Sequence, residues 1–317
     1  MGAGSQKPHE AFVIQPAPPV GPGLAYASAR AFHEAVKARL ITTAKDSPYS
    51  VAELRRQFAY DRLLTRVFFH DPDHWVLKGA TGLLSRLPDQ ARHSMDVDLY
   101  FQGELDAAVA SLIAATDLDL GDYFTFDIEK SNDLAGGNPG ARIKVASYIG
   151  DTMFMGFRID AVIATNMTGA PESTAGLSPI TIAGLPTAAY RTYPVVDHIA
   201  DKHAAMVATY QGGSPSSRYR DLVDLVLLAT TQRPEAGALH TALTSEYHHR
   251  GVAPPAEVTL PSPNWTDGYA HQARDVPKFA HRTAESGLAV VKAMLDPILT
   301  GRTTGRWDPE KLAWVEH

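Results

Sequence analysis

The sequence predicts a mixed α/β fold, an α+β arrangement in which a mixed sheet is flanked by helices and followed by a mostly helical C-terminal half. Three observations support this prediction. Apolar residues recur at helical spacing before residue 71, short runs within 75–163 alternate at period two, and helical spacing returns after residue 194. With 317 residues, 44% of them hydrophobic, the chain can bury a large core in one domain or two.

Two helices are expected at the start of the fold, after a flexible tail at residues 1–23. The first should cover 26–44, where Phe32 and its apolar neighbours share one face. The second should run from Ser50 to His70. Its first residues contain a capping-box pattern, in which the Ser50 and Glu53 side chains each satisfy a free backbone amide.

Alternating and β-branched residues predict the strands of the sheet. These strands are expected at 75–77, 95–101, 123–129, 141–149 and 152–163, with one helix at 104–115. The first strand leads into the turn Lys78-Gly79-Ala80-Thr81-Gly82, which is expected to open a short helix from Leu83 to Leu87.

A Gly-, Pro-, Ser- and Thr-rich connection at 171–186 is the predicted boundary between a sheet-containing unit, 24–186, and a helical unit, 187–317. Helices are expected over 195–210, ending at Gly212-Gly213, and then over 217–231, 236–248 and 285–299, with an extended linker at 254–263. The helix at 217–231 is apolar nearly all round, which predicts that it is buried.

Composition excludes several kinds of site. The chain has no cysteine, so it cannot use a disulfide, a zinc-thiolate site or a thiol nucleophile, and this suits a cytoplasmic protein. The apolar runs are too short to span a bilayer, and the first residues do not form a signal peptide, so no membrane partner is expected. A net charge of -6 means that binding to nucleic acid would need a local basic patch.

Three aspartates form the strongest candidate site. Asp96 and Asp98 are two apart on a predicted strand, so their side chains share one face, and Asp160 interrupts a later apolar strand that could lie beside it. Burying three acids without a cation would cost several kcal/mol each, so a metal is the better explanation. Two magnesium ions on such carboxylates would neutralise a triphosphate and activate a hydroxyl. The small residues of the Gly79 turn would let backbone amides approach phosphates, and Thr81 could add a hydroxyl.

These residues resemble the first motif of the AbiEii/AbiGii toxin family, within the polymerase-β-like nucleotidyltransferase superfamily. The resemblance covers the stretch Trp75 to Phe101 and continues at Asp201-Lys202 and at the block from Ser217 to Leu225. The chain departs from the family pattern in having Ala80 where a second glycine is usual and Arg220 where lysine is usual. Neither change removes a metal ligand.

The resemblance implies a toxin of a toxin-antitoxin system that transfers NMP from an NTP, using magnesium, to an acceptor hydroxyl. The expected acceptor is the 3′ end of tRNA, and a cognate antitoxin is the expected protein partner. It assigns the metals to Asp96, Asp98 and Asp160, and catalytic roles to these three with Lys202, Asp221 and Asp224. The residues expected to bind the nucleotide are Lys78, Gly79, Ala80, Thr81, Arg92, Ser94, Lys202 and Arg218.

Alternatives remain open for several of these residues. Lys202 could instead be a lysine that pairs with a nearby acid, and Arg218, Asp221 and Asp224 could form a structural ion pair on one face of a buried helix. The helical unit is expected to bind the acceptor through Arg191, Lys202, Arg218 and Arg220. A small-molecule or protein hydroxyl could replace tRNA as acceptor, or the chain could be a non-catalytic binding module of the same fold.

Overall fold

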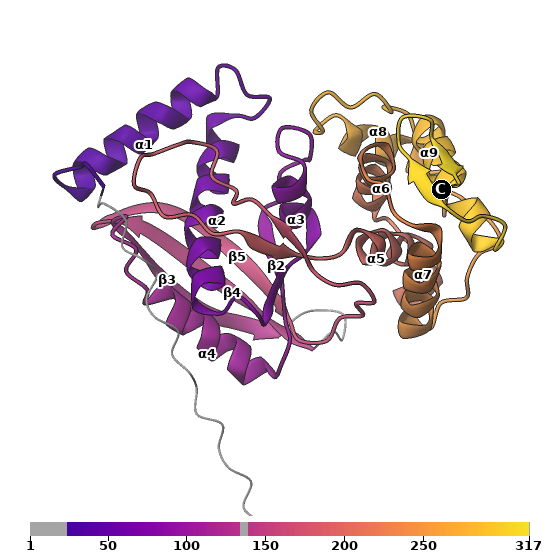
Figure 1. The fold of residues 1–317 in the computed structure, drawn as a ribbon, viewed down its shortest axis with the longest axis horizontal. Helices are drawn as coiled ribbons and strands as arrows, with labels where there is room; N and C mark the ends of the chain where they lie inside the picture. The colour runs from indigo at the N-terminus through magenta and orange to yellow at the C-terminus, as the bar shows by residue number, and fades with distance from the viewer. Residues whose placement is uncertain (1–23, 134–138, 317) are drawn as a thin grey trace, which may run out of the picture.

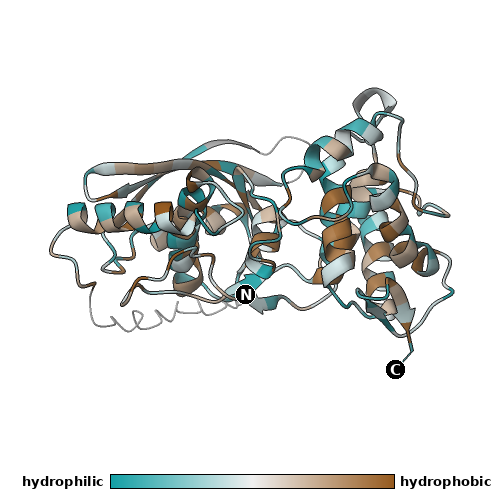
Figure 2. Cartoon of the chain, turned by 90° about the horizontal axis from the view of Figure 1, so that it is seen from above, coloured by the Kyte–Doolittle hydropathy of each residue, from teal (hydrophilic) through white to brown (hydrophobic). Residues whose placement is uncertain are grey.

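A computed structural model describes residues 24–133 and 139–316, and the predicted tail at 1–23 lies outside this range. The described chain contains a sheet-containing part and a helical part, which lie side by side in both views (Figure 1, Figure 2). The predicted fold class is confirmed, with a mixed sheet flanked by helices and followed by helices. No helix in the described ranges has both the length and the apolar character needed to cross a membrane.

Seven strands of the described chain form the main sheet, in the order β3-β4-β5-β2-β1-β7-β6. β2 runs parallel to β5, and β1 runs parallel to β7, while the other neighbours are antiparallel. The strands are β1 (Trp75–Leu77), β2 (Asp96–Phe101), β3 (Phe124–Asp133), β4 (Gly140–Ile149), β5 (Thr152–Val162), β6 (Glu172–Thr174) and β7 (Tyr190–Thr192).

Helices cover one face of the sheet. These are α1 (Ala29–Thr43), α2 (Val51–His70) and α4 (Leu105–Thr116), which contact the strands on that side. Val97, Leu99 and Phe101 of β2 are buried on this face, whereas the residues between them, including Asp96 and Asp98, point to the other face. The alternation that predicted the strand therefore also separates the core from the polar face.

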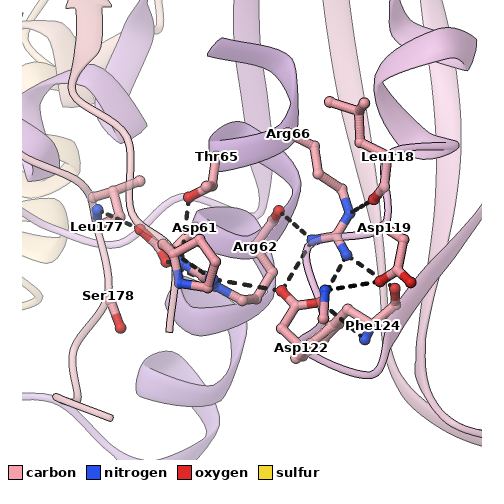
Figure 3. Close-up of polar contacts among 12 residues, drawn as sticks. Asp61, Arg62, Thr65, Arg66, Leu118, Asp119, Asp122, Phe124, Leu177 and Ser178 are labelled. Atoms are coloured by element: carbon pink, nitrogen blue, oxygen red, sulfur yellow. Dashed lines mark hydrogen bonds and ion pairs between the residues drawn. The ribbon is translucent and has the colours of Figure 1, made fainter. Parts of the chain in front are cut away.

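The predicted capping box at the start of α2 is confirmed. The Glu53 carboxylate accepts the Ser50 amide at 2.8 Å, and the Ser50 hydroxyl accepts the Glu53 amide at 3.3 Å. This helix carries charge into the core, because Arg62 and Arg66 are fully buried. Figure 3 shows both guanidiniums converging on Asp122, which lies just before β3, with Arg66 Nη2 2.7 Å from Asp122 Oδ1. Asp61 pairs with Arg62 and accepts the Leu177 amide at 2.8 Å, so the cluster joins helix, sheet and connection.

The helical part is built around α6 (Tyr219–Thr231), which is buried from Asp221 through Ala229, as its apolar sequence predicted. It contacts α5 (Val195–Val207), α8 (Trp265–Ala273) and α9 (Ala284–Leu299), and α7 (Ala236–Arg250) packs on α5. A two-stranded ribbon, β10 (Arg306–Asp308) and β11 (Ala313–Val315), follows.

Several element boundaries differ from the prediction. α3 (Gly79–Arg86) begins at Gly79 itself rather than at Leu83, because Lys78 is extended and ends the strand directly. α5 ends at Val207, and the residues to Pro215 form a small hairpin of β8 (Thr209–Tyr210) and β9 (Ser214–Pro215) around the short helix η1 (Gln211–Gly213). The paired glycines there have positive φ angles and make the turn of this hairpin rather than a helix end.

The predicted connection at 171–186 contains a strand, since β6 pairs with β7 at the edge of the main sheet. β7 also lies beside β1, and only Tyr193 and Pro194 separate β7 from α5. The Tyr193 amide donates to the Leu77 carbonyl at 2.9 Å. The first helix of the helical part is therefore attached directly to the central sheet.

Candidate functional site

The three aspartates lie on neighbouring strands of the open sheet face. In the β2–β5 ladder Asp98 pairs directly with Asp160, and Asp96 pairs with Arg158. β4 adds Arg142 opposite Asp160. Acids and arginines therefore share one face of three adjacent strands, and the structure brings Asp160 beside the two acids of β2.

Arginine side chains hold two of these carboxylates. Arg142 grips Asp160 with two hydrogen bonds of 2.7 Å each, and Arg158 Nε donates to Asp96 Oδ1 at 2.8 Å. The Asp98 carboxylate accepts no hydrogen bond from the described parts of the chain. Within those same parts, no three His, Asp or Glu side chains are close enough as they stand to hold a metal ion.

Gly79 makes room for the Asp98 carboxylate. Its φ angle is +61°, and a Cβ at this position would lie only 1.8 Å from Asp98 Oδ2. A side chain is therefore excluded here both by backbone strain and by the carboxylate. The Lys78 amide fixes the same strand by donating to the Asp98 carbonyl at 2.9 Å, so the start of α3 is held against the carboxylate.

The environment of Asp98 favours its protonated form. Burial is the main cause, and the nearby charge of Asp160 adds to it, so the pKa of Asp98 rises from 3.8 to about 6 despite the opposing effect of Lys78 and Lys202. A carboxylate with so little compensation attracts a cation.

A cavity of about 630 Å³ opens beside Asp98 between the sheet and the helical part. Its walls include Ala80 and Ser94 and a set of charged side chains. The cationic residues are Lys78, Arg92, Lys202, Arg218, Arg220 and Arg250, and the acidic residues are Asp98, Asp160, Asp201 and Asp221. Cations thus outnumber acids by six to four, which suits a polyanionic ligand.

Lys202 projects from α5 into a buried ion network. Its side chain is 6% exposed, and its Nζ lies 2.6 Å from Asp224 and 3.3 Å from Asp221. Arg92 donates to both oxygens of Asp224, at 3.1 and 2.8 Å, and Arg218 pairs with Asp221. Burial would raise the pKa of Asp224, but Arg92 and Lys202 outweigh it and lower the pKa to about 2.

Not all of the residues predicted for the site line the cavity. The Thr81 hydroxyl donates to the Asp96 carbonyl at 3.1 Å and is buried, so it holds the strand rather than facing the cavity. Arg191, expected in the basic patch, approaches the Pro72 carbonyl and Gln102 and is not part of the cavity wall. The predicted patch of four cations does not form a single surface.

Five residues of the site were not among those singled out. Arg158 lies two residues before Asp160 on its strand and Arg142 lies two residues before Lys144, and this period-two pattern of charged residues could have revealed them. Asp201 was noted only as part of a motif, and it pairs with Arg250 from α7. No local pattern points to Arg250 or to Gln272, because contacts between distant helices bring them to the cavity.

Comparison with known families identifies the class of protein as a nucleotidyltransferase. Residues 62–300 match the family described as "Nucleotidyl transferase AbiEii toxin, Type IV TA system", and the chain belongs to this family. The resemblance seen in the sequence is thus confirmed. No curated protein matches the chain.

The chain is similar to several solved structures, among them the following two. One is a crystal structure from H. pylori to which nucleotidyltransferase activity has been attributed, with 16% identity, a TM-score of 0.45, and coverage of 78% of this chain and 96% of that one. The other is a solution structure of the antibiotic-resistance factor ANT(2'')-Ia, with 18% identity, a TM-score of 0.32, and coverage of 61% and 98%.

Proposed function

We propose that this chain transfers a nucleotidyl group from an NTP to an acceptor hydroxyl, releasing pyrophosphate, and that the acceptor is the 3′ end of tRNA. Modifying that end would block translation, and a cognate antitoxin would counter the effect. One observation carries the proposal: the Asp98 carboxylate, which accepts no hydrogen bond within the described chain, lies between the Gly79 turn and Asp160 at the wall of a cationic cavity. Membership of the AbiEii family supports it.

The triphosphate is expected to bind in the cavity. Backbone amides at the start of α3 are free to donate to phosphate oxygens, and the helix dipole favours negative charge there. Lys78, Lys202 and Arg218 reach the same space from three elements. The volume of about 630 Å³ is in the range of ordinary small-ligand sites.

Magnesium fits the donors at this site, because carboxylate oxygens are the ligands that this cation prefers. Asp96, Asp98 and Asp160 would hold it, in place of the arginine contacts that Asp96 and Asp160 make with Arg158 and Arg142. The bound cations would neutralise the triphosphate and lower the pKa of the attacking hydroxyl. Asp221 and Asp224 take a different part, since they hold Lys202 in place.

Incubation with each labelled NTP and total RNA tests the proposal. The wild-type chain should label RNA in the presence of magnesium, and Asp98→Asn should reduce labelling by at least about 10³-fold, the effect of removing a group essential to transition-state stabilisation. Lys37→Glu, on the exposed side of α1, is a control that should label normally. Full activity of Asp98→Asn would refute the assignment.

The position of the label separates the alternative acceptors. Label in protein or in a small molecule, with none in RNA, would replace tRNA by another hydroxyl acceptor. Binding of NTP without transfer to any fraction would instead show a binding module of the same fold. Chelation of divalent ions should abolish transfer and be reversed by added magnesium.

A further inference from the structure

We propose that the acceptor strand binds in a groove on the open face of β3, β4 and β5, next to Asp96 and across the carboxylates from the triphosphate cavity. This inference rests on the proposed function and adds the surface that receives the nucleic acid. It differs from the expectation that the helical part alone binds the acceptor.

The groove is a separate depression of about 570 Å³. Its floor contains Ala146 and Gly156, a register pair of small residues on β4 and β5. Two methionines flank it, Met95 and Met153, whose exposed fractions of 60% and 54% are unusual for large apolar side chains. Flexible, polarizable methionines can adapt to the flat faces of a ribose and a base.

A row of paired residues connects the groove to the carboxylates. Glu129, Lys144, Arg158 and Asp96 follow one another across β3, β4, β5 and β2. Arg158 lines the groove and also donates to Asp96. The two cations of the groove, Lys144 and Arg158, are thus nearest to the carboxylates, and its two acids, Asp127 and Glu129, lie on β3 at the sheet edge.

The geometry of nucleotidyl transfer favours the groove as the side from which the acceptor hydroxyl approaches. In an in-line displacement the attacking oxygen and the leaving oxygen lie on opposite sides of the phosphorus atom. The leaving pyrophosphate belongs with the cationic cavity, which Asp98 and Asp160 line, while Arg158 faces the groove. The attacking hydroxyl must therefore approach from the groove side.

The chemistry of the groove fits the end of a single strand. Phosphates of the strand can contact Lys144 and Arg158, which are 61% and 50% exposed, and its last nucleotide can cover the apolar floor. Because the whole chain carries a net charge of -6, such local cations are needed to attract phosphate. Both cations are paired at the protein surface, Lys144 with Glu129 and Arg158 with Asp96, so a bound phosphate would replace a carboxylate at each of them.

Filling the groove tests the proposal. A Cβ on Gly156 would be 3.4 Å from the Met153 methyl group and meet no other side chain within 4 Å, so Gly156→Leu is accommodated by the backbone and occupies the floor. We expect Gly156→Leu and Lys144→Glu each to reduce RNA labelling at least tenfold while NTP affinity stays within twofold of wild type. Gly237→Leu on α7, where a Cβ meets nothing within 4 Å, and Lys37→Glu are the matched controls.

The other outcomes are equally distinct. Wild-type labelling by both groove variants, with a loss in Arg220→Glu, would overturn the inference and place the acceptor on the helical side. Normal labelling by Gly156→Leu that the antitoxin no longer inhibits would assign the groove to a protein partner instead. If the wild-type chain binds NTP but labels no RNA, the proposed function fails and the inference fails with it.

Discussion

Two clusters of arginine and aspartate in this chain have the same composition and opposite character. In the cluster of α2, Asp61, Arg62, Arg66 and Asp122 are all fully buried, and each charge is paired (Figure 3). On the open sheet face, the aspartates are partly exposed and Asp98 has no hydrogen-bond donor in the described chain. The comparison teaches that the paired charges are enclosed in the core, whereas the carboxylate without a hydrogen-bond donor lies beside the cavity that we propose as the reactive site.

The largest effect on stability should come from the buried cluster. Asp122→Asn leaves Arg62 with its partner Asp61 but removes the carboxylate that pairs with the buried Arg66, and it should destabilise the fold by about 3–5 kcal/mol. Urea unfolding measures this loss. A loss below about 1 kcal/mol would mean that the cluster does not hold α2 to the sheet.

A buried neutral histidine should give the next effect. His203 lies on α5 against the Tyr247 hydroxyl, and burial lowers its pKa from 6.5 to about 4. The unfolded chain therefore binds a proton that the folded chain does not, and stability is lost as the pH falls from about 6.5 to about 4. Over this range the wild type should lose on the order of 3 kcal/mol more than His203→Phe. Parallel curves for the two proteins would contradict the assignment.

Asp98 should make the stability depend on pH in the opposite direction to His203. Its pKa in the folded state is about 6 against an ordinary 3.8, so its contribution to stability is present below about pH 4 and lost as the pH rises through 6. At neutral pH the charged carboxylate destabilises the folded protein. Asp98→Asn should therefore stabilise the metal-free protein by about 2 kcal/mol. The same substitution should abolish nucleotidyl transfer. Thermal unfolding in EDTA should show only about half of the gain at pH 5, which lies between the two pKa values, and all of it at pH 8.

The smallest effect on stability should come from substituting Asp96, although it lies only two residues before Asp98. Its partner Arg158 is half exposed, and such pairs contribute up to about 1 kcal/mol. Asp96→Asn should therefore change the free energy of unfolding by about 0.5 kcal/mol while strongly reducing transfer. A stability loss as large as that of Asp122→Asn would remove the distinction between the two clusters.

The sequence predicted what local patterns determine. The capping box at Ser50 and the period-two strands follow from neighbouring residues, and the same alternation placed Asp96 and Asp98 on one face. The sequence also indicated Asp160, because burying an acid in an otherwise apolar strand is costly unless a partner compensates its charge. The register that sets Asp160 opposite Asp98 required the fold.

Contacts between distant segments determine the parts of the fold and the site that the sequence did not predict. The short strands β6 and β7 have three residues each, too few for a pattern. α8 has only nine residues and includes Gly268, a poor helix former, yet a Cβ there would lie 2.6 Å from the Tyr219 ring, so packing requires the glycine. The pairing of Lys202 and Arg92 with Asp224 likewise joins three segments that no local pattern connects.

One carboxylate, Glu172 on β6, ties together the two helices that shape the cavity. It pairs with Arg86 at the end of α3 and accepts the Val195 amide at the start of α5, at 3.0 Å. A substitution that removes these two contacts of Glu172 would displace both the Gly79 turn and Lys202, although Glu172 itself would contact no ligand. A genetic selection for cells that survive overproduction of the chain should therefore return substitutions at Glu172 alongside those at the aspartates.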